Sequence, residues 1–294
     1  MLCPICRSAA TRSCFPHAGF DIRRCTTCDH LWAAGGAPAD YANKPSLFDY
    51  YKRDERPHRA LMRKSLRQVR PWLRPGALIL DFGCGPGLFV LEARAQGYEA
   101  VGIDVASWVA DAAEHWGLPL HVGPLELAPY AAASFDAVVS IVSYEHLADP
   151  AAITARLARL VKPGGVLAVM SVPHSRGIAW WLAREKWWDL APPEHLHFFS
   201  RRSLGRLLGD NGLEVVETHT TGVGSGFFAS LLGRDRNTKL ALDQFQLQTN
   251  SGEAGGAAGP VRWLAARVVV PFLNGCLDVT RLGNNLTMIA RKPA

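Results

Sequence analysis

The 294-residue sequence predicts an α/β fold, a parallel β-sheet covered by helices, with a short cysteine-rich module in front of it. Two observations carry this prediction. From Pro75 to about residue 173, short apolar runs alternate with stretches of helical periodicity, which implies crossover connections between parallel strands. In the first 30 residues, two Cys-x-x-Cys pairs hold four of the seven cysteines, which separates this segment from the rest.

The composition is that of a globular protein. Apolar residues make up 48% of the chain and charged residues 20%, which excludes disorder over most of its length. No uncharged apolar run reaches the ~18 residues that a membrane-spanning helix needs, and the N-terminal segment lacks a signal-peptide pattern. We therefore expect a cytoplasmic protein whose paired cysteines bind a metal rather than form disulfides.

The cysteine module predicts a structural zinc site. Cys3 and Cys6 form the first pair and Cys25 and Cys28 the second, with eighteen residues between the pairs, a spacing typical of a four-thiolate zinc ribbon. Four protein ligands leave no open position, so the Zn²⁺ is expected to be structural, with Cys14 or His17 as alternative ligands. The expected domains are this module (1–34), a linker and basic helix (35–75) and the main domain (76–294), with a flexible connector at 33–38.

The positive charge is concentrated in one segment. The net charge is +6, and the segment from Lys52 to Arg74 holds nine basic residues against Asp54 and Glu55. Arginines at 56, 59, 63, 67, 70 and 74 form a stripe beside apolar residues at helical spacing, which predicts an amphipathic helix with Pro57 in its first turn. The stripe is either a solvated face or a site for an anionic partner. The near-neutral remainder argues against nucleic acid as a partner.

The main domain contains a regular series of expected elements. Strands are expected at 77–82, 99–105, 118–122, 135–142 and 164–172, with helices at 88–97, 106–117 and 150–161. Two later strands are expected at 213–220 and 285–291. The stretch 244–259, rich in Gly, Ala, Gln and Ser, predicts a loop.

A glycine-rich turn, Asp81 to Gly87 (DFGCGPG), joins the first strand of this domain to its helix. Glycines at such a turn let the backbone bend sharply and approach a ligand at the helix N-terminus. The third glycine of a dinucleotide-binding motif would fall at Leu88, so the spacing does not favour NAD.

The turn instead resembles the first motif, acid-x-Gly-x-Gly-x-Gly, of class I S-adenosylmethionine-dependent methyltransferases, in particular the methyltransferase-23-like group. Asp104, at the end of the next strand, matches the acid that holds the cofactor ribose. Further similarity lies at FDAVVS (135–140), YEHL (144–147) and LVKPGG (160–165). The resemblance implies a Rossmann-like seven-stranded sheet with helical cap insertions at about 174–200 and 221–284, and S-adenosyl-L-methionine as cofactor.

The cofactor-binding residues that this resemblance implies are Asp81, Gly83, Cys84, Gly85, Gly87, Asp104, Val105, Leu125 and Ser140. Many relatives read Gly-Asp after the third strand, and this chain has Gly123-Pro124-Leu125-Glu126 instead. Backbone groups near Leu125, or Glu126, would then contact the adenine. A zinc ribbon ahead of such a domain resembles bacterial methyltransferases of small-molecule and polysaccharide pathways.

The catalytic candidates follow the fourth and fifth strands of the domain, because ligands bind at the carboxyl ends of parallel strands. Glu145 and His146 follow the fourth strand. His195 matches a His-Leu-x-x-Phe-Ser/Thr signature of many such enzymes in the segment PPEHLHFFS, whereas His197 does not. Three roles stay open for His195: bracing the next helix, contacting substrate or transferring a proton.

Two apolar segments bear on the acceptor. The first contains Trp180, Trp181, Trp187 and Trp188, and the second is the arginine-flanked segment 262–277. Both segments suit either a cap over the active site or contact with a lipid surface. We expect methyl transfer to a small molecule, namely a sugar, a polysaccharide precursor or a lipid-linked metabolite, with peripheral membrane contact as an alternative location. The alternative function is an RNA or protein methyltransferase that binds its target through the ribbon and the arginine stripe. The sequence gives no oligomeric state.

Overall fold

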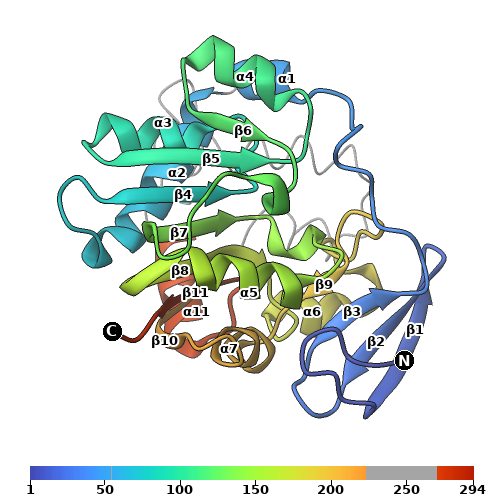
Figure 1. Cartoon of the computed structure of the whole chain (residues 1–294). Helices are drawn as coiled ribbons and strands as arrows, with labels where there is room; N and C mark the ends of the chain where they lie inside the picture. Colours follow the sequence, from blue (N-terminus) through green and yellow to red (C-terminus); the bar gives the residue numbers. More distant parts are fainter. Residues whose placement is uncertain (54, 223–269) are drawn as a thin grey trace.

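The computed structural model describes residues 1–53, 55–222 and 270–294, and its central element is a seven-stranded sheet (Figure 1). The strand order is β10-β11-β8-β7-β4-β5-β6. The strands are β4 (Leu78–Phe82), β5 (Glu99–Asp104), β6 (Leu120–Val122), β7 (Phe135–Ile141), β8 (Val161–Pro173), β10 (Glu214–Thr221) and β11 (Asn285–Arg291). The pairs from β6 to β8 are parallel, and β11 is antiparallel to both β8 and β10. The predicted Rossmann-like seven-stranded sheet is therefore confirmed.

Helices cover both faces of this sheet (Figure 1). On one face, α2 (Glu55–Val69) and α3 (Leu88–Ala95) bury Leu66 and Phe89 against the sheet. On the other, α5 (Pro150–Leu160) and α7 (Arg201–Gly209) bury Leu157 and Leu204. Each fully buried side chain of this kind contributes about 2 kcal/mol through the hydrophobic effect. Other helices in the described part of the chain include α1 (Phe48–Arg53), α4 (Val109–Trp116) and α11 (Val270–Thr280), of which α1 contacts α4 and α11 contacts β10.

Local sequence signals explain where the helices begin. Asp149 accepts a hydrogen bond from the Ala152 amide and Pro150 opens α5, which is the capping pattern expected at a helix N-terminus. Ser200 and Ser203 form a reciprocal capping box at the start of α7. The predicted amphipathic helix is confirmed as α2, which contains Pro57 in its first turn.

Part of the arginine stripe of α2 forms ion pairs within the protein. Arg59 and Arg63 both pair with the buried Glu92 of α3, and Arg59 also pairs with Glu55. Arg74, beyond the helix, pairs with Asp136. These ion pairs hold α2 on α3, which gives part of the stripe a structural role.

The cysteine module forms a second, smaller sheet with the main domain. Its strands are β1 (Thr11–His17), β2 (Phe20–Cys25) and β3 (Leu31–Ala34), and β9 (His197–Phe198) is the fourth member. Leu31 lies opposite Phe198 and Trp32 opposite His197. The predicted connector at 33–38 is wrong at its start, because Ala33 and Ala34 belong to β3 and are buried. They pair with Ile22 and Asp21 of β2, and the Ala33 amide also donates to the Leu196 carbonyl oxygen, just before β9.

The tryptophan-rich segment packs against this module. It forms α6 (Ile178–Ala183) and a 3-10 turn, η4 (Arg184–Lys186). Trp180 and Trp187 are buried with Phe20 and Ile22 of β2 in one apolar cluster, whereas Trp181 is 66% exposed. The buried half of this predicted cap therefore covers the cysteine module. Lipid contact by the exposed half stays a prediction.

Two other expectations fall partly or wholly outside the described residues. These are the loop at 244–259 and the greater part of the apolar segment 262–277. Among the helices of the described part, none has both the length and the hydropathy needed to cross a membrane.

Candidate active site and cysteine cluster

The glycine-rich turn lies between β4 and α3 and requires glycine at specific positions. Gly83, Gly85 and Gly87 all have left-handed backbone angles, with φ of +73°, +49° and +75°. A Cβ on Gly83 would lie 2.3 Å from Ser143 Oγ, and one on Gly87 would lie 2.8 Å from a Leu120 methyl group. Both the conformation and the close contacts therefore exclude other side chains here.

The carboxylate of Asp104, at the end of β5, is bound to this turn. The Gly85 amide donates to Oδ2 at 2.9 Å and the Ala106 amide donates to Oδ1 at 3.0 Å. A Cβ on Gly85 would meet only the Trp108 ring, at 4.0 Å, so the backbone has open space on this side. Half-buried backbone at Gly83 and Gly85 and an adjacent carboxylate form a cradle that fits a ligand with hydroxyl groups.

Three predicted catalytic side chains come together beside the turn. Glu145 and His146 lie in a 3-10 turn, η3 (Tyr144–His146), after β7, and His195 lies just before β9. One ligand atom from each of the three lies within 4.8 Å of the other two. The Leu196 amide donates to the Glu145 carbonyl oxygen at 2.7 Å and so joins the two segments. We call these three residues the Glu-His-His cluster.

The hydrogen bonds of the cluster define its protonation. His146 Nδ1 lies 2.8 Å from the Glu194 carbonyl oxygen and His195 Nδ1 lies 2.7 Å from that of Asp189. A carbonyl oxygen only accepts, so each Nδ1 carries a proton. Burial lowers the pKa of His146 and raises the pKa of Glu145 to about 8.

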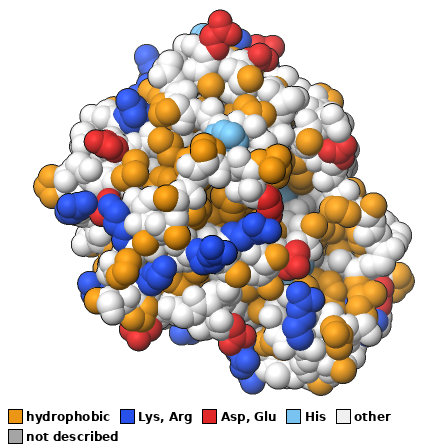
Figure 2. Space-filling view, viewed as in Figure 1, with side chains coloured by type: hydrophobic (Ala, Val, Ile, Leu, Met, Phe, Trp, Pro, Cys, Tyr) orange, Lys and Arg blue, Asp and Glu red, His pale blue; other side chains and the backbone are white. Residues whose placement is uncertain are grey.

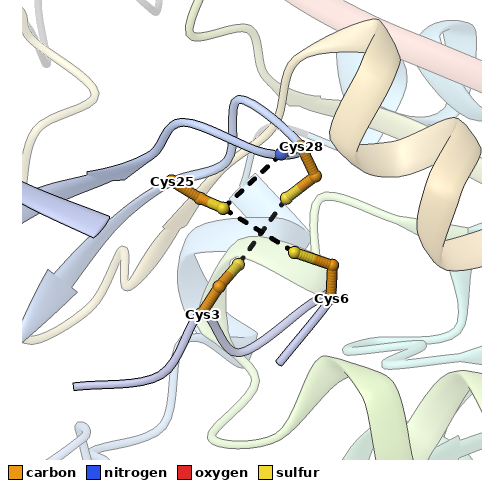
Figure 3. Close-up of side chains that lie close together, drawn as sticks. All are labelled: Cys3, Cys6, Cys25 and Cys28. Carbon is orange, nitrogen blue, oxygen red and sulfur yellow. Dashed lines mark hydrogen bonds between the residues drawn. The ribbon is translucent and has the colours of Figure 1, made fainter. Parts of the chain in front are cut away.

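The four paired cysteines converge on one point (Figure 3). Cys3 Sγ lies 3.6 Å from Cys28 Sγ, and Cys6 Sγ lies 3.6 Å from Cys25 Sγ. These distances exceed a disulfide bond of about 2.05 Å and are close to the ~3.8 Å between thiolates at a tetrahedral zinc with bonds of about 2.3 Å. The donor set and its geometry fit Zn²⁺.

Both Cys-x-x-Cys loops have the same backbone shape. The Arg7 amide donates to the Cys3 carbonyl oxygen and the Asp29 amide to that of Cys25, each at 3.0 Å. Arg7 and Asp29 adopt left-handed φ angles of 57° and 65°. Cys14 packs against the apolar cluster of β2 and α6, and neither Cys14 nor His17 joins the four-sulfur cluster within the described residues.

Comparison with known proteins identifies the family. Residues 51–218 match the family described as "Methyltransferase domain", which covers more than half of the chain. The chain belongs to this family. The fold is that of the class I S-adenosylmethionine-dependent methyltransferases.

Curated relatives of this methyltransferase are named for O-methylation. The chain is similar to the ubiquinone biosynthesis O-methyltransferase of Hahella chejuensis, with 37% identity over 100 residues, 32% of this chain and 42% of that protein. The corresponding protein of Xanthomonas oryzae pv. oryzae is 38% identical over 99 residues, 31% of this chain and 41% of that protein. The chain thus spans about two fifths of the length of these relatives.

Solved structures share the fold of this methyltransferase. A chain from the complex between the Haloferax volcanii Trm112 methyltransferase activator and a methyltransferase matches with a TM-score of 0.56 and 17% identity, over 87% of this chain and 98% of that chain. An Archaeoglobus fulgidus SAM-dependent methyltransferase matches with a TM-score of 0.53 and 18% identity, over 83% and 99%.

The remaining predicted cofactor residues surround the turn of the methyltransferase. Asp81 is buried, and burial together with Asp104 raises the pKa of Asp81 to about 8. A cationic ligand group nearby would favour its ionised form. Cys84 and Leu125 are buried, and Val105 is exposed. Gly123, two residues before Leu125, donates to the Asp104 carbonyl oxygen at 2.8 Å, which places this loop beside Asp104.

The structure gives two of the predicted cofactor contacts, Ser140 and Glu126, other surroundings than expected. Ser140 is fully buried in β7, and Ser143, which the sequence did not single out, is the serine that contacts Gly83. The alternative adenine contact, Glu126, pairs with Arg156 at 3.1 Å. The assignment of Ser140 to the cofactor stays a prediction.

Residues before α2 also reach the candidate site, and sequence reasoning missed them. Tyr41 Oη lies 2.7 Å from His146 Nδ1, and Lys44 Nζ lies 3.5 Å from Glu194 Oε1. Tyr51 of α1 stacks on Trp108, which lies next to the cofactor turn. These residues lie in a stretch without periodicity, so no local pattern identifies them.

Proposed function

We propose that this protein transfers the methyl group of S-adenosyl-L-methionine to a hydroxyl group of a small molecule, namely a sugar, a polysaccharide precursor or a lipid-linked metabolite. One observation carries the proposal. Ser143 Oγ donates to the Gly83 carbonyl oxygen at 3.4 Å, and η3, which contains Glu145 and His146, begins at the next residue. The cofactor turn and the Glu-His-His cluster are therefore neighbours.

The cofactor supplies an electrophilic methyl group on a positively charged sulfur. Asp104 would bind its ribose hydroxyls and the backbone of the glycine turn its methionine part, as the resemblance implies. The acceptor oxygen loses its proton and forms a bond to the methyl carbon, while the carbon–sulfur bond breaks and its electron pair stays on sulfur. The methyl ether, S-adenosylhomocysteine and one proton are the products. The protein mainly has to position the oxygen and exclude water.

An oxygen acceptor is favoured for two reasons. The relatives are named for O-methylation, and a hydroxyl group, unlike a free amine, needs help to lose its proton. The pKa of His146 is lowered by burial and its Nδ1 donates to a backbone carbonyl, so the neutral ring carries its lone pair on Nε2, beside Glu145. This nitrogen is suited to receive or direct the hydroxyl group.

The zinc ion that we propose for the four cysteines has a structural role. A four-thiolate site has no position left for substrate. It would hold the β1–β3 module together, and this module in turn pairs with β9, two residues after His195. The ion therefore supports the active site without touching it.

Two observations argue against an RNA target. Arg59 and Arg63 are engaged in ion pairs with the buried Glu92. Figure 2 shows basic side chains alongside acidic and hydrophobic ones on the face in view. Nucleic-acid binding usually requires a continuous basic surface.

The test is transfer of labelled methyl from S-adenosylmethionine into fractionated cell extract. Label in the small aqueous or organic-soluble fraction supports the proposal and separates a free sugar from a lipid-linked acceptor. Label in RNA or protein overturns it. Asp104→Ala, in which cofactor binding should be strongly weakened, is the matched control for labelling by other enzymes.

A further inference from the structure

We propose that Glu145, His146 and His195 together bind one divalent transition-metal ion, distinct from the zinc of the cysteine module, and that this ion holds the acceptor hydroxyl group. The inference rests on the proposed function and deepens it, because it names how the acceptor is recognised. Its ligands are the three residues of the Glu-His-His cluster, which shares no residue with the four-cysteine cluster.

The donor set is the first argument. Two imidazoles and one carboxylate form the combination that binds Zn²⁺, Fe²⁺ and similar ions in many enzymes. The ligand atoms lie within 4.8 Å of one another, and Glu145 Oε1 lies 4.0 Å from His146 Nε2. Ligands around one ion with bonds of about 2.1 Å lie ~3.4 Å apart in a tetrahedron, so the side chains need to approach by about 1 Å.

The orientation of both imidazoles is the second argument. A histidine that binds metal through one ring nitrogen almost always donates a hydrogen bond from the other to a carbonyl or carboxylate. His146 and His195 do this through Nδ1, to the carbonyl oxygens of Glu194 and Asp189. Tyr41 Oη is a second partner of His146 Nδ1, at 2.7 Å. In each neutral ring, Nε2 is then the nitrogen that a metal would bind.

The third argument is the position of Glu145. Its side chain is 1% exposed, and within the described residues its Oε2 atom has no hydrogen-bond partner although it is buried. An unsatisfied buried carboxylate oxygen costs roughly 1–3 kcal/mol or more. A cation within the cluster would remove this cost, which explains why a carboxylate is placed here.

Three protein ligands leave coordination positions for the acceptor. An ion at this position would polarise a hydroxyl group and ease the loss of its proton to water. A second oxygen on the neighbouring carbon could occupy another open position. We therefore expect acceptors with two adjacent oxygen atoms, such as a vicinal diol or an ortho-dihydroxy ring, to be methylated faster than acceptors with one.

The test uses the full chain with its cysteine site loaded with one zinc, verified by metal analysis. Mn²⁺ is then added and its free concentration measured by electron paramagnetic resonance. Mn²⁺ binds thiolates weakly and does not displace zinc. The expected result is one Mn²⁺ per chain, with affinity about tenfold or more lower in Glu145→Gln and His195→Ala. His115→Ala, at an exposed histidine of α4, should bind as the native protein does.

Two outcomes would overturn the inference: no saturable Mn²⁺ binding, or binding that neither cluster variant weakens. Glu145→Gln is nearly isosteric and keeps the test valid if His195→Ala fails to fold. Failure of this inference and failure of the proposed function give different results. Saturable Mn²⁺ binding without methyl transfer to small molecules supports this site and contradicts the proposed reaction. Methyl transfer that is equally fast after selective removal of the second ion contradicts this site alone.

Discussion

The Gly85 amide donates a hydrogen bond to Asp104 Oδ2 across 2.9 Å, so the glycine turn and the acid at the end of β5 are connected directly. The two motifs are separated by one parallel strand and one helix in sequence. Because the carboxylate also accepts from the Ala106 amide, its orientation is fixed before a cofactor arrives. Such preorganisation reduces the entropy cost of binding.

Replacement of Asp104 should therefore weaken cofactor binding strongly and leave the fold intact. We expect Asp104→Ala to bind S-adenosylhomocysteine about 10- to 100-fold more weakly, because hydrogen bonds to a charged group contribute about 1.5–3 kcal/mol. Isothermal titration calorimetry measures this loss, with Asp111→Ala, an exposed acid of α4, as control. Normal affinity of Asp104→Ala would refute the assignment.

Gly83→Ala should destabilise the protein more than a comparable glycine substitution. Gly97 has a similar φ of +84°, but a Cβ there meets nothing within 4 Å, whereas a Cβ on Gly83 lies 2.3 Å from Ser143 Oγ. We expect a loss of about 1 kcal/mol for Gly97→Ala and about 3 kcal/mol for Gly83→Ala. Chemical denaturation compares the two, and equal losses would show that the contact with Ser143 does not matter.

Loss of the proposed zinc should disturb the tryptophan cluster. Cys25→Ser removes one ligand, and the β1–β3 module cannot bury enough apolar surface to fold without metal. Trp180 and Trp187, buried against that module, should then become exposed, with a red shift of tryptophan fluorescence and a lower melting temperature. The matched control is Cys276→Ser, at an exposed cysteine of α11. If both variants behave alike, the four cysteines do not bind a structural ion.

Acid should destabilise the fold through His174. Burial lowers the pKa of this histidine from 6.5 to about 4, although its Nδ1 donates to the Gly283 carbonyl oxygen at 2.8 Å. Between pH 6.5 and about 4 the unfolded chain takes up a proton that the folded protein does not, so stability falls as the pH falls through this window. The loss is on the order of 3 kcal/mol.

The variant that isolates this effect is His174→Gln, which keeps an N–H donor and cannot titrate. Its free energy of unfolding should depend less on pH between 6.5 and 4 than that of the native protein. His115→Gln, on the exposed face of α4, should follow the native curve. An unchanged slope in His174→Gln would assign the acid sensitivity to other groups.

Local patterns in the sequence predict the sheet of the main domain well. The strands β4, β5, β7 and β11 lie within two residues of their expected bounds, because their apolar runs are bounded by glycines, prolines and charged residues. The glycine turn and Asp104 are also found from sequence, since their spacing follows from the strand–turn–helix connection.

Contacts between distant segments could not be predicted. The pairing of β3 with β9 joins residue 32 to residue 197, and neither strand carries a signal for its partner. Glu145 and His146 are candidates from one segment and His195 is a candidate from another, and only the folded structure shows that their ligand atoms lie within 4.8 Å of one another. Tyr41 reaches His146 from an irregular segment, where sequence gives no orientation.

The pairing of β3 with β9 also means that the first 34 residues are not an exchangeable cassette. A chain cut back to residue 35 would lose the neighbour of the strand that follows His195 and would present Trp180, Trp187 and Phe198 to water. We expect such a truncation to aggregate and to misplace His195. Replacing this N-terminal module with a different one would therefore change the shape of the candidate active site around His195.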